Sequence, residues 1–128
     1  MSSILSTCTT GGATVAAGAT LPLGSATHRC GCMALDGSAV RVPCPGCIRV
    51  DASVCFAPTA AGAATVNLVD GTAVVASATA TSTAANQMIA IPLTATLKGS
   101  RRPDAKVLSL TASAAGTTGP TSARVTSE

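Results

Sequence analysis

Six cysteines carry the concentrated chemistry of this 128-residue sequence: Cys8, Cys30, Cys32, Cys44, Cys47 and Cys55. Two close pairs, Cys-x-Cys at 30 and 32 and Cys-x-x-Cys at 44 and 47, have the spacing of a four-thiolate zinc site. Zinc binds thiolates tetrahedrally at about 2.3 Å, and a Cys-x-x-Cys turn supplies two of them. Because alternate residues of a strand point to the same side, Cys30 and Cys32 can face one metal together. Structural zinc is therefore one interpretation.

Three other interpretations of the cysteines stay open. Disulfides form only in oxidising surroundings, and bridges within or between chains are a second interpretation. A redox pair at Cys44 and Cys47 needs a helix N-terminus to lower the thiol pKa, whereas Pro45-Gly46 leads into an expected strand. A free cysteine packs as a small hydrophobic residue, which suits a core poor in aromatic side chains.

The rest of the sequence does not indicate catalysis. His28 is the sole histidine and shares one side of an expected strand with Cys30, but the sequence suggests no third group to orient it. The five acidic residues are scattered, and Asp36 and Asp70 each precede a glycine, as is typical of turns. We therefore expect a protein that is not an enzyme, with no catalytic residue, no cofactor and no assigned metal ligand.

Charge is sparse, at 10% of residues with a net charge of +3. The one dense cluster consists of Lys98, Arg101, Arg102 and Lys106, with Asp104 inside it. Nucleic-acid-binding proteins usually add aromatic or amide side chains to a basic face, so we interpret this cluster as a solvated loop rather than a phosphate-binding patch. No apolar run approaches the roughly 18 residues that span a bilayer, and residues 1–10 lack the features of a secretory signal. We expect neither nucleic acid nor a membrane as a partner.

The elements that position these residues are expected to be strands. Between Ile48 and Phe56 every second residue is apolar and the residues between them are polar or cysteine, which predicts a half-buried strand. Asp70-Gly71 between two alternating runs predicts a hairpin, and Pro92 predicts an edge strand or a bulge. The alanine-rich stretches 57–64 and 75–85 fit strands better than linkers. Further strands are expected at 13–17, 20–23, 27–35, 39–42, 65–69, 72–79, 87–97, 106–112 and 122–127.

The interior of such an all-β fold must be built from small side chains. Hydrophobic residues make up 47% of the chain, yet Phe56 is the only aromatic residue. Small side chains bury little apolar area, and burial stabilises by about 25 cal/mol per Å². We therefore expect an interior that sister copies must complete, and hence an oligomer.

The segment from Pro45 to Phe56 resembles a strand of the complement-type globular heads in the tumour necrosis factor-like superfamily. Pro45, Gly46, Val50 and Val54 fit that family's pattern, as does Phe56, whereas residue 48 is isoleucine where the family has an aromatic. The resemblance implies a single-domain, antiparallel β-sandwich with jelly-roll topology.

The wider layout is similar to that of small phage structural proteins with the same jelly roll. The similarity covers residues 11–112 and includes a Gly-, Ala- and Thr-rich strand at 11–18, the step Leu21-Pro22-Leu23-Gly24, the hairpin at 65–79 and an apolar strand at 88–93. By this resemblance, such proteins form compact trimers displayed on virions as head decorations, head fibres or tail-fibre tips. A three-fold ring closes through heterologous contacts and covers sheet edges.

These observations predict a jelly-roll domain at 13–128 after an N-terminal arm at 1–12, which would dock on a capsid or donate a strand. The resemblance implies a homotrimeric capsid decoration protein, made in the host cytoplasm, that binds the major capsid protein on the outer surface of the virion and stabilises the head. The alternative is a phage tail-fibre or receptor-binding module that contacts the host surface.

Overall fold

The computed structural model describes residues 3–43, 46–71, 73–99 and 106–127, and every regular element in that part of the chain is a β-strand. The strands are β1 (Ser3–Thr9), β2 (Thr14–Val15), β3 (Ser25–Cys30), β4 (Ala34–Asp36), β5 (Ala39–Val42), β6 (Gly46–Pro58), β7 (Gly62–Asp70), β8 (Ala73–Ser82), β9 (Ile89–Gly99), β10 (Lys106–Ala112) and β11 (Gly116–Ser127). No helix long and apolar enough to cross a membrane is found among the described residues.

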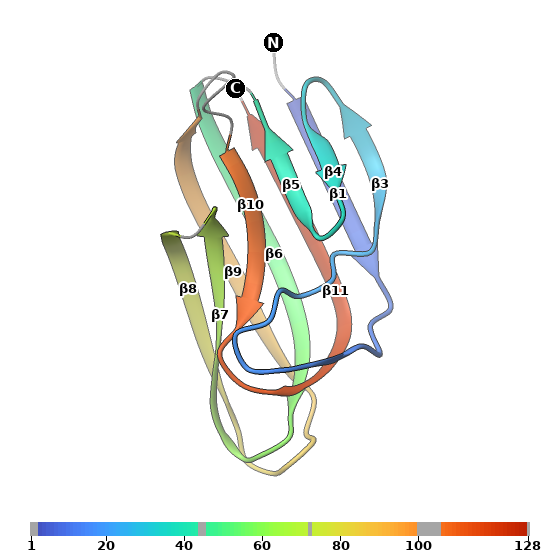
Figure 1. The fold of residues 1–128 in the computed structure, drawn as a ribbon, viewed down its shortest axis with the longest axis vertical. Helices are drawn as coiled ribbons and strands as arrows, with labels where there is room; N and C mark the ends of the chain where they lie inside the picture. Colours follow the sequence, from blue (N-terminus) through green and yellow to red (C-terminus); the bar gives the residue numbers. More distant parts are fainter. Residues whose placement is uncertain (1–2, 44–45, 72, 100–105, 128) are drawn as a thin grey trace.

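The strands form two antiparallel sheets that pack face to face (Figure 1). Sheet A has the order β3-β1-β11-β6-β9, with β2 paired to β11, and sheet B has the order β4-β5-β10-β7-β8. Neighbours within a sheet come from distant parts of the chain, such as β1 beside β11. The buried residues of both sheets form one hydrophobic cluster. The predicted all-β, antiparallel, single-domain sandwich is confirmed.

Strand β6 shows why the alternating pattern predicts its position. Its residues from Ile48 to Phe56 are buried at every second position, and β6 pairs with β11 on one side and β9 on the other. The alternation thus directs one side of the strand into the sandwich and the other side outward. The predicted half-buried strand is confirmed and extends to Gly46–Pro58.

The predicted hairpin and edge strand are also confirmed. β7 and β8 are antiparallel partners joined at Asp70-Gly71, where Gly71 has a φ of 64° that favours glycine. Both alanine-rich stretches contribute residues to these strands. Pro92 lies in β9, which is the edge strand of sheet A, so its missing N–H interrupts no ladder on the open side.

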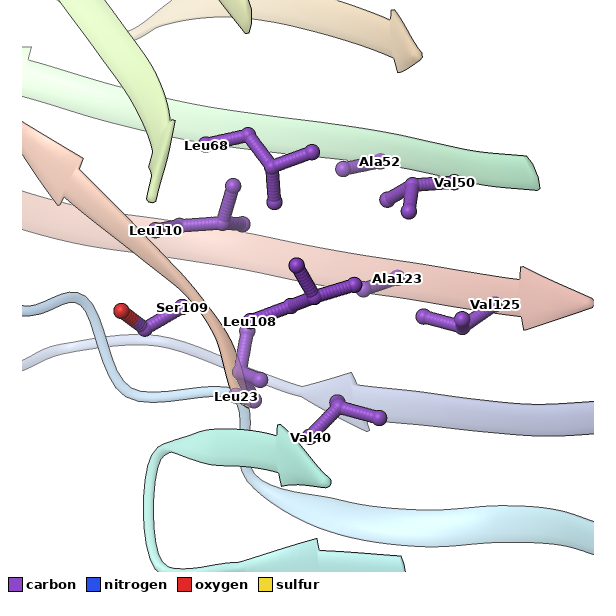
Figure 2. Close-up of a pocket in the computed structure, with 10 residues that line it drawn as sticks. All are labelled: Leu23, Val40, Val50, Ala52, Leu68, Leu108, Ser109, Leu110, Ala123 and Val125. Atoms are coloured by element: carbon purple, nitrogen blue, oxygen red, sulfur yellow. The ribbon is translucent and has the colours of Figure 1, made fainter. Parts of the chain in front are cut away.

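Within a single chain, the buried residues of the two sheets pack closely against one another. Figure 2 shows Ala52 and Ala123 of sheet A facing Leu68, Leu108 and other aliphatic side chains of sheet B. The space left between them is about 10 Å³. That is no more than one water molecule occupies, and Ser109 is the one polar residue among the ten that line the space. Alanines on one sheet opposite leucines on the other fill this part of the sandwich without an aromatic ring.

The predicted N-terminal arm at 1–12 is wrong for most of its length. β1 runs from Ser3 to Thr9 and lies inside sheet A between β3 and β11. Leu5 is completely buried, and Thr7 is 2% exposed. The sequence hides this strand because a threonine occupies an inward position, which weakens the apolar alternation. The jelly-roll domain therefore begins at β1 rather than at residue 13.

The predicted strand at 27–35 divides into two. Gly31, with a φ of 96°, separates β3 in sheet A from β4 in sheet B, so the chain passes from one sheet to the other at this point. The predicted strand at 20–23 is reduced to an isolated bridge between Thr20 and Thr111. Leu21 and Leu23 nevertheless enter the core from this segment.

Candidate interaction face

The outward side of sheet A brings together the four free cysteines of the described chain, His28 and Lys98. We call it the sheet A face. On the central strands, its residues are those that alternate with the buried positions. On the edge strands, its residues are those paired with these outward positions. They are Ile4, Ser6, Cys8, His28, Cys30, Cys47, Arg49, Asp51, Ser53, Cys55, Pro92, Thr94, Thr96, Lys98, Ser122, Arg124 and Thr126. Small polar side chains dominate this face.

Charges of both signs lie near its centre. Asp51 pairs across the strands with Arg124, and its Oδ2 atom is 3.2 Å from Nε of Arg49. The two side chains of that ion pair are 69% and 37% exposed, so it contributes under about 1 kcal/mol to the stability of one chain. Its chemical consequence is that the centre of the face exposes both a carboxylate and guanidinium groups.

Two shallow hollows lie on the face. One, of about 570 Å³, extends over β1, β11 and β6, and its lining includes Ser6, Cys8, Ser53 and Ser122. The other, of about 240 Å³, is lined by Cys47, Arg49, Thr96 and Thr126. Apart from Arg49, Asp51 and Arg124, the side chains that line the hollows are short, so the backbone of another molecule can approach the sheet closely between them.

The structure distinguishes among the cysteines. Cys32 is disulfide-bonded, so its sulfur is not a thiolate ligand, and the four-thiolate zinc site is not formed. Cys44 lies outside the described residues, which leaves the redox hypothesis untested. Within the described ranges, no group of three or more His, Cys, Asp or Glu residues could hold a metal ion. Cys8, Cys30 and Cys47 are free and exposed, and Cys55 is free and half-buried.

The sole histidine belongs to the sheet A face, whereas the basic cluster is divided. His28 and Cys30 are exposed on the same side of β3, as the strand period predicts. Lys106 Nζ lies 3.0 Å from Asp70 Oδ2, so a carboxylate neutralises one member of the basic cluster. Arg101, Arg102 and Asp104 lie outside the described residues.

Large apolar side chains are exposed mainly away from the sheet A face. Among the described residues they are Val74 at 59%, Val75 at 39%, Met88 at 49% and Val107 at 39%. The three valines belong to sheet B, at the end where β7 turns into β8. The sheet A face is thus mainly polar, and the exposed valines lie on the other sheet.

Solved structures with this arrangement of strands are numerous. Murine APRIL at pH 5.0 superposes with a TM-score of 0.70, at 12% identity and 98% coverage of both chains. The globular domain of the zebrafish complement 1qA protein gives 0.66, at 5% identity and 97% and 94% coverage. The vertex protein P5 of PRD1 gives 0.66, at 12% identity and 98% and 96% coverage. The fold is a tumour necrosis factor-like jelly roll.

This result confirms the fold that the segment from Pro45 to Phe56 implies. The likeness to the tumour necrosis factor-like jelly rolls extends over nearly the whole chain and therefore includes β1. No family model matches the sequence, and no curated protein matches it either. At these identities the likeness establishes the architecture, and function has to be argued from the surface.

Proposed function

We propose that this chain is a virion structural protein: a homotrimer, assembled through the sheet A face, that docks on the outer surface of a phage head and stabilises it. The observation that carries the proposal is the likeness, over nearly the full length of both chains, to the vertex protein of PRD1. That protein is a virion component by its name, and the sequence pattern of residues 11–112 resembles phage structural proteins independently.

The sheet A face supports the trimer. It is formed by the long central strands β1, β11 and β6, and its short side chains permit close approach. In a closed three-fold ring each copy contacts two neighbours through two different parts of its surface. Each copy would therefore use two different parts of the sheet A face. The central Asp51 and its neighbouring arginines supply charge complementarity between copies, which determines register more than affinity.

The function follows from assembly rather than from reaction chemistry. A trimer docked across neighbouring capsid subunits buries surface on each of them, and binding to the assembled state alone stabilises that state by mass action. We propose the major capsid protein as the partner, and no catalytic step.

A charge at the centre of the sheet A face tests the trimer. Ser122 is exposed on β11 and lines the larger hollow, so Ser122→Arg places a long cation where copies meet. We expect the wild type to have the mass of three chains by light scattering, and Ser122→Arg that of one. Thr81→Arg, on the exposed side of β8 in sheet B, is the matched control and should stay trimeric. A monomeric wild type, or equal masses for the two variants, would contradict the proposed trimer.

Quantifying the chain in purified particles of its own virus tests the location. We expect hundreds of copies per particle, and trimers added back to particles lacking them should raise the temperature at which the heads rupture. A handful of copies would indicate a tail-fibre tip instead, and absence from particles would refute a virion function.

A further inference from the structure

All four free cysteines of the described chain project from the sheet A face. Cys8 and Cys30 lie on β1 and β3, at one side of the face, whereas Cys47 and Cys55 lie on β6, toward the opposite edge. The five strands of sheet B contain no cysteine. The thiols are therefore concentrated on the surface that the proposed trimer would bury.

None of these four thiols can bridge to another within one chain. Strands lie about 4.8 Å apart and rise about 3.3 Å per residue, so the nearest two, Cys8 and Cys55, are roughly 12 Å apart across β11. A disulfide requires Cα atoms about 4.4 to 6.8 Å apart. Among the free cysteines that the structure describes, a bonding partner must therefore come from another molecule.

Cys30 and Cys47 are the pair best placed to meet between copies. Cys30 is exposed on the edge strand β3, so it is the thiol that a neighbour reaches first. The paired residues of β1 and β11 show which position of β6 lies level with Cys30, and that position is two residues from Cys47. The two cysteines are therefore offset by about 7 Å along the strand direction. Cys47 is exposed and borders the 240 Å³ hollow, which leaves room for an entering edge strand. In a closed ring, the β3 side of one copy meets the β6–β9 side of the next.

We propose that disulfides between Cys30 of one copy and Cys47 of the next lock the ring covalently under oxidising conditions. This inference rests on the proposed homotrimer. Each ring then contains three identical bridges, and every chain is linked to both of its neighbours. A particle released from a reducing cell would thereby carry trimers that cannot dissociate into single chains on dilution.

The chemistry needs an oxidant, and a small-molecule disulfide such as oxidised glutathione supplies it. The Cys47 thiolate attacks one sulfur of that disulfide, forming a mixed disulfide and releasing one glutathione thiolate. The Cys30 thiolate of the neighbouring copy then attacks the Cys47 sulfur and releases the second. Each cysteine loses one proton, and the two electrons reduce the sulfur–sulfur bond of the oxidant.

The test is a denaturing gel without reductant, after the full chain has been treated with oxidised glutathione. We expect a covalent trimer band that dithiothreitol converts to monomer. Cys30→Ser and Cys47→Ser should each reduce that band more than tenfold. The matched control, Cys8→Ser combined with Cys55→Ser, also removes one thiol from each side of the face and should leave the trimer band unchanged. Cys32 and Cys44 stay unaltered in every variant.

Light scattering in dithiothreitol separates this inference from the proposed function. A trimer that persists in reductant but forms no covalent trimer would overturn the disulfide and leave the homotrimer standing. Covalent dimers without trimers would overturn it as well, because a symmetric bridge between identical cysteines joins only two chains. Loss of the trimer band in the Cys8→Ser, Cys55→Ser control would show that the bridge is not the proposed pair, and would reject the proposal. A monomer in reductant would refute the trimer itself.

Discussion

Phe56 is the single aromatic side chain of the molecule, and it is fully buried near the end of β6. Its ring lies against Gly116 at the start of β11: a methyl group added to that glycine would lie 2.7 Å from Cζ of the ring and would also meet the backbone of the neighbouring strand. The glycine therefore provides the space that the ring fills. One large residue closes this end of the sandwich, while aliphatic side chains fill the rest.

Replacing Phe56 with alanine should lower the free energy of unfolding by about 3 to 5 kcal/mol, because the ring loses its burial and leaves a cavity. Urea unfolding at one fixed protein concentration measures the change. Thr81→Ala, on the exposed side of β8 in sheet B, serves as the control and should stay within about 0.5 kcal/mol of the wild type. Equal effects of the two substitutions would mean that the ring does not anchor the core.

At the scale of elements, β1 is a strand of sheet A that the sequence-based prediction treated as part of an arm. An arm could be removed without harm to the domain, but β1 pairs with β11 over its full length and with β3 on its other side. It also contributes Leu5 to the core. Loss of this strand would leave β3 without a partner and open one side of the sandwich.

We therefore expect Leu5→Ala to cost about 2 to 5 kcal/mol of unfolding free energy, as buried leucines do in cores. A chain that lacks residues 1–9 should fail to give a cooperative thermal transition. Circular dichroism during heating measures both. If the truncated chain melted like the wild type, the segment would be the detachable arm that the sequence suggested.

How far the strands could be predicted depends on how strictly they alternate. The predicted boundaries of β5 and β10 match the structure, and the central segment of β6 and the β7–β8 hairpin were located correctly. β1 was missed because Thr7 takes an inward position. The break at Gly31 was missed because the change from sheet A to sheet B depends on tertiary packing rather than on local periodicity.

The candidate site was predictable only in part, for a related reason. Alternation along β6 shows that Cys47, Arg49 and Asp51 share one side of a strand. It does not show that β1, from the start of the chain, and β11, from its end, lie beside that strand. The face exists because long-range pairing assembles it, and no single segment contains its pattern.

At the scale of the whole molecule, the closed core and the polar sheet A face change the argument for assembly. Composition suggested that association completes an interior that is too thin. The structure instead has a filled sandwich and an outward surface of short polar side chains. Association would then add stability to a chain that already folds, as binding to the native state does by mass action.

This view predicts that a dissociated chain keeps its fold. The melting temperature of the wild type should rise with protein concentration over a hundredfold series, because association stabilises the folded state. Ser122→Arg should melt lower, in one cooperative transition whose midpoint does not change with concentration, since a chain that is already monomeric has no association to gain. Thr81→Arg should follow the wild type. Differential scanning calorimetry with light scattering on the same samples measures both properties. A Ser122→Arg chain without a cooperative transition would mean that the copies do complete the interior, because a core sufficient by itself would survive the loss of its neighbours.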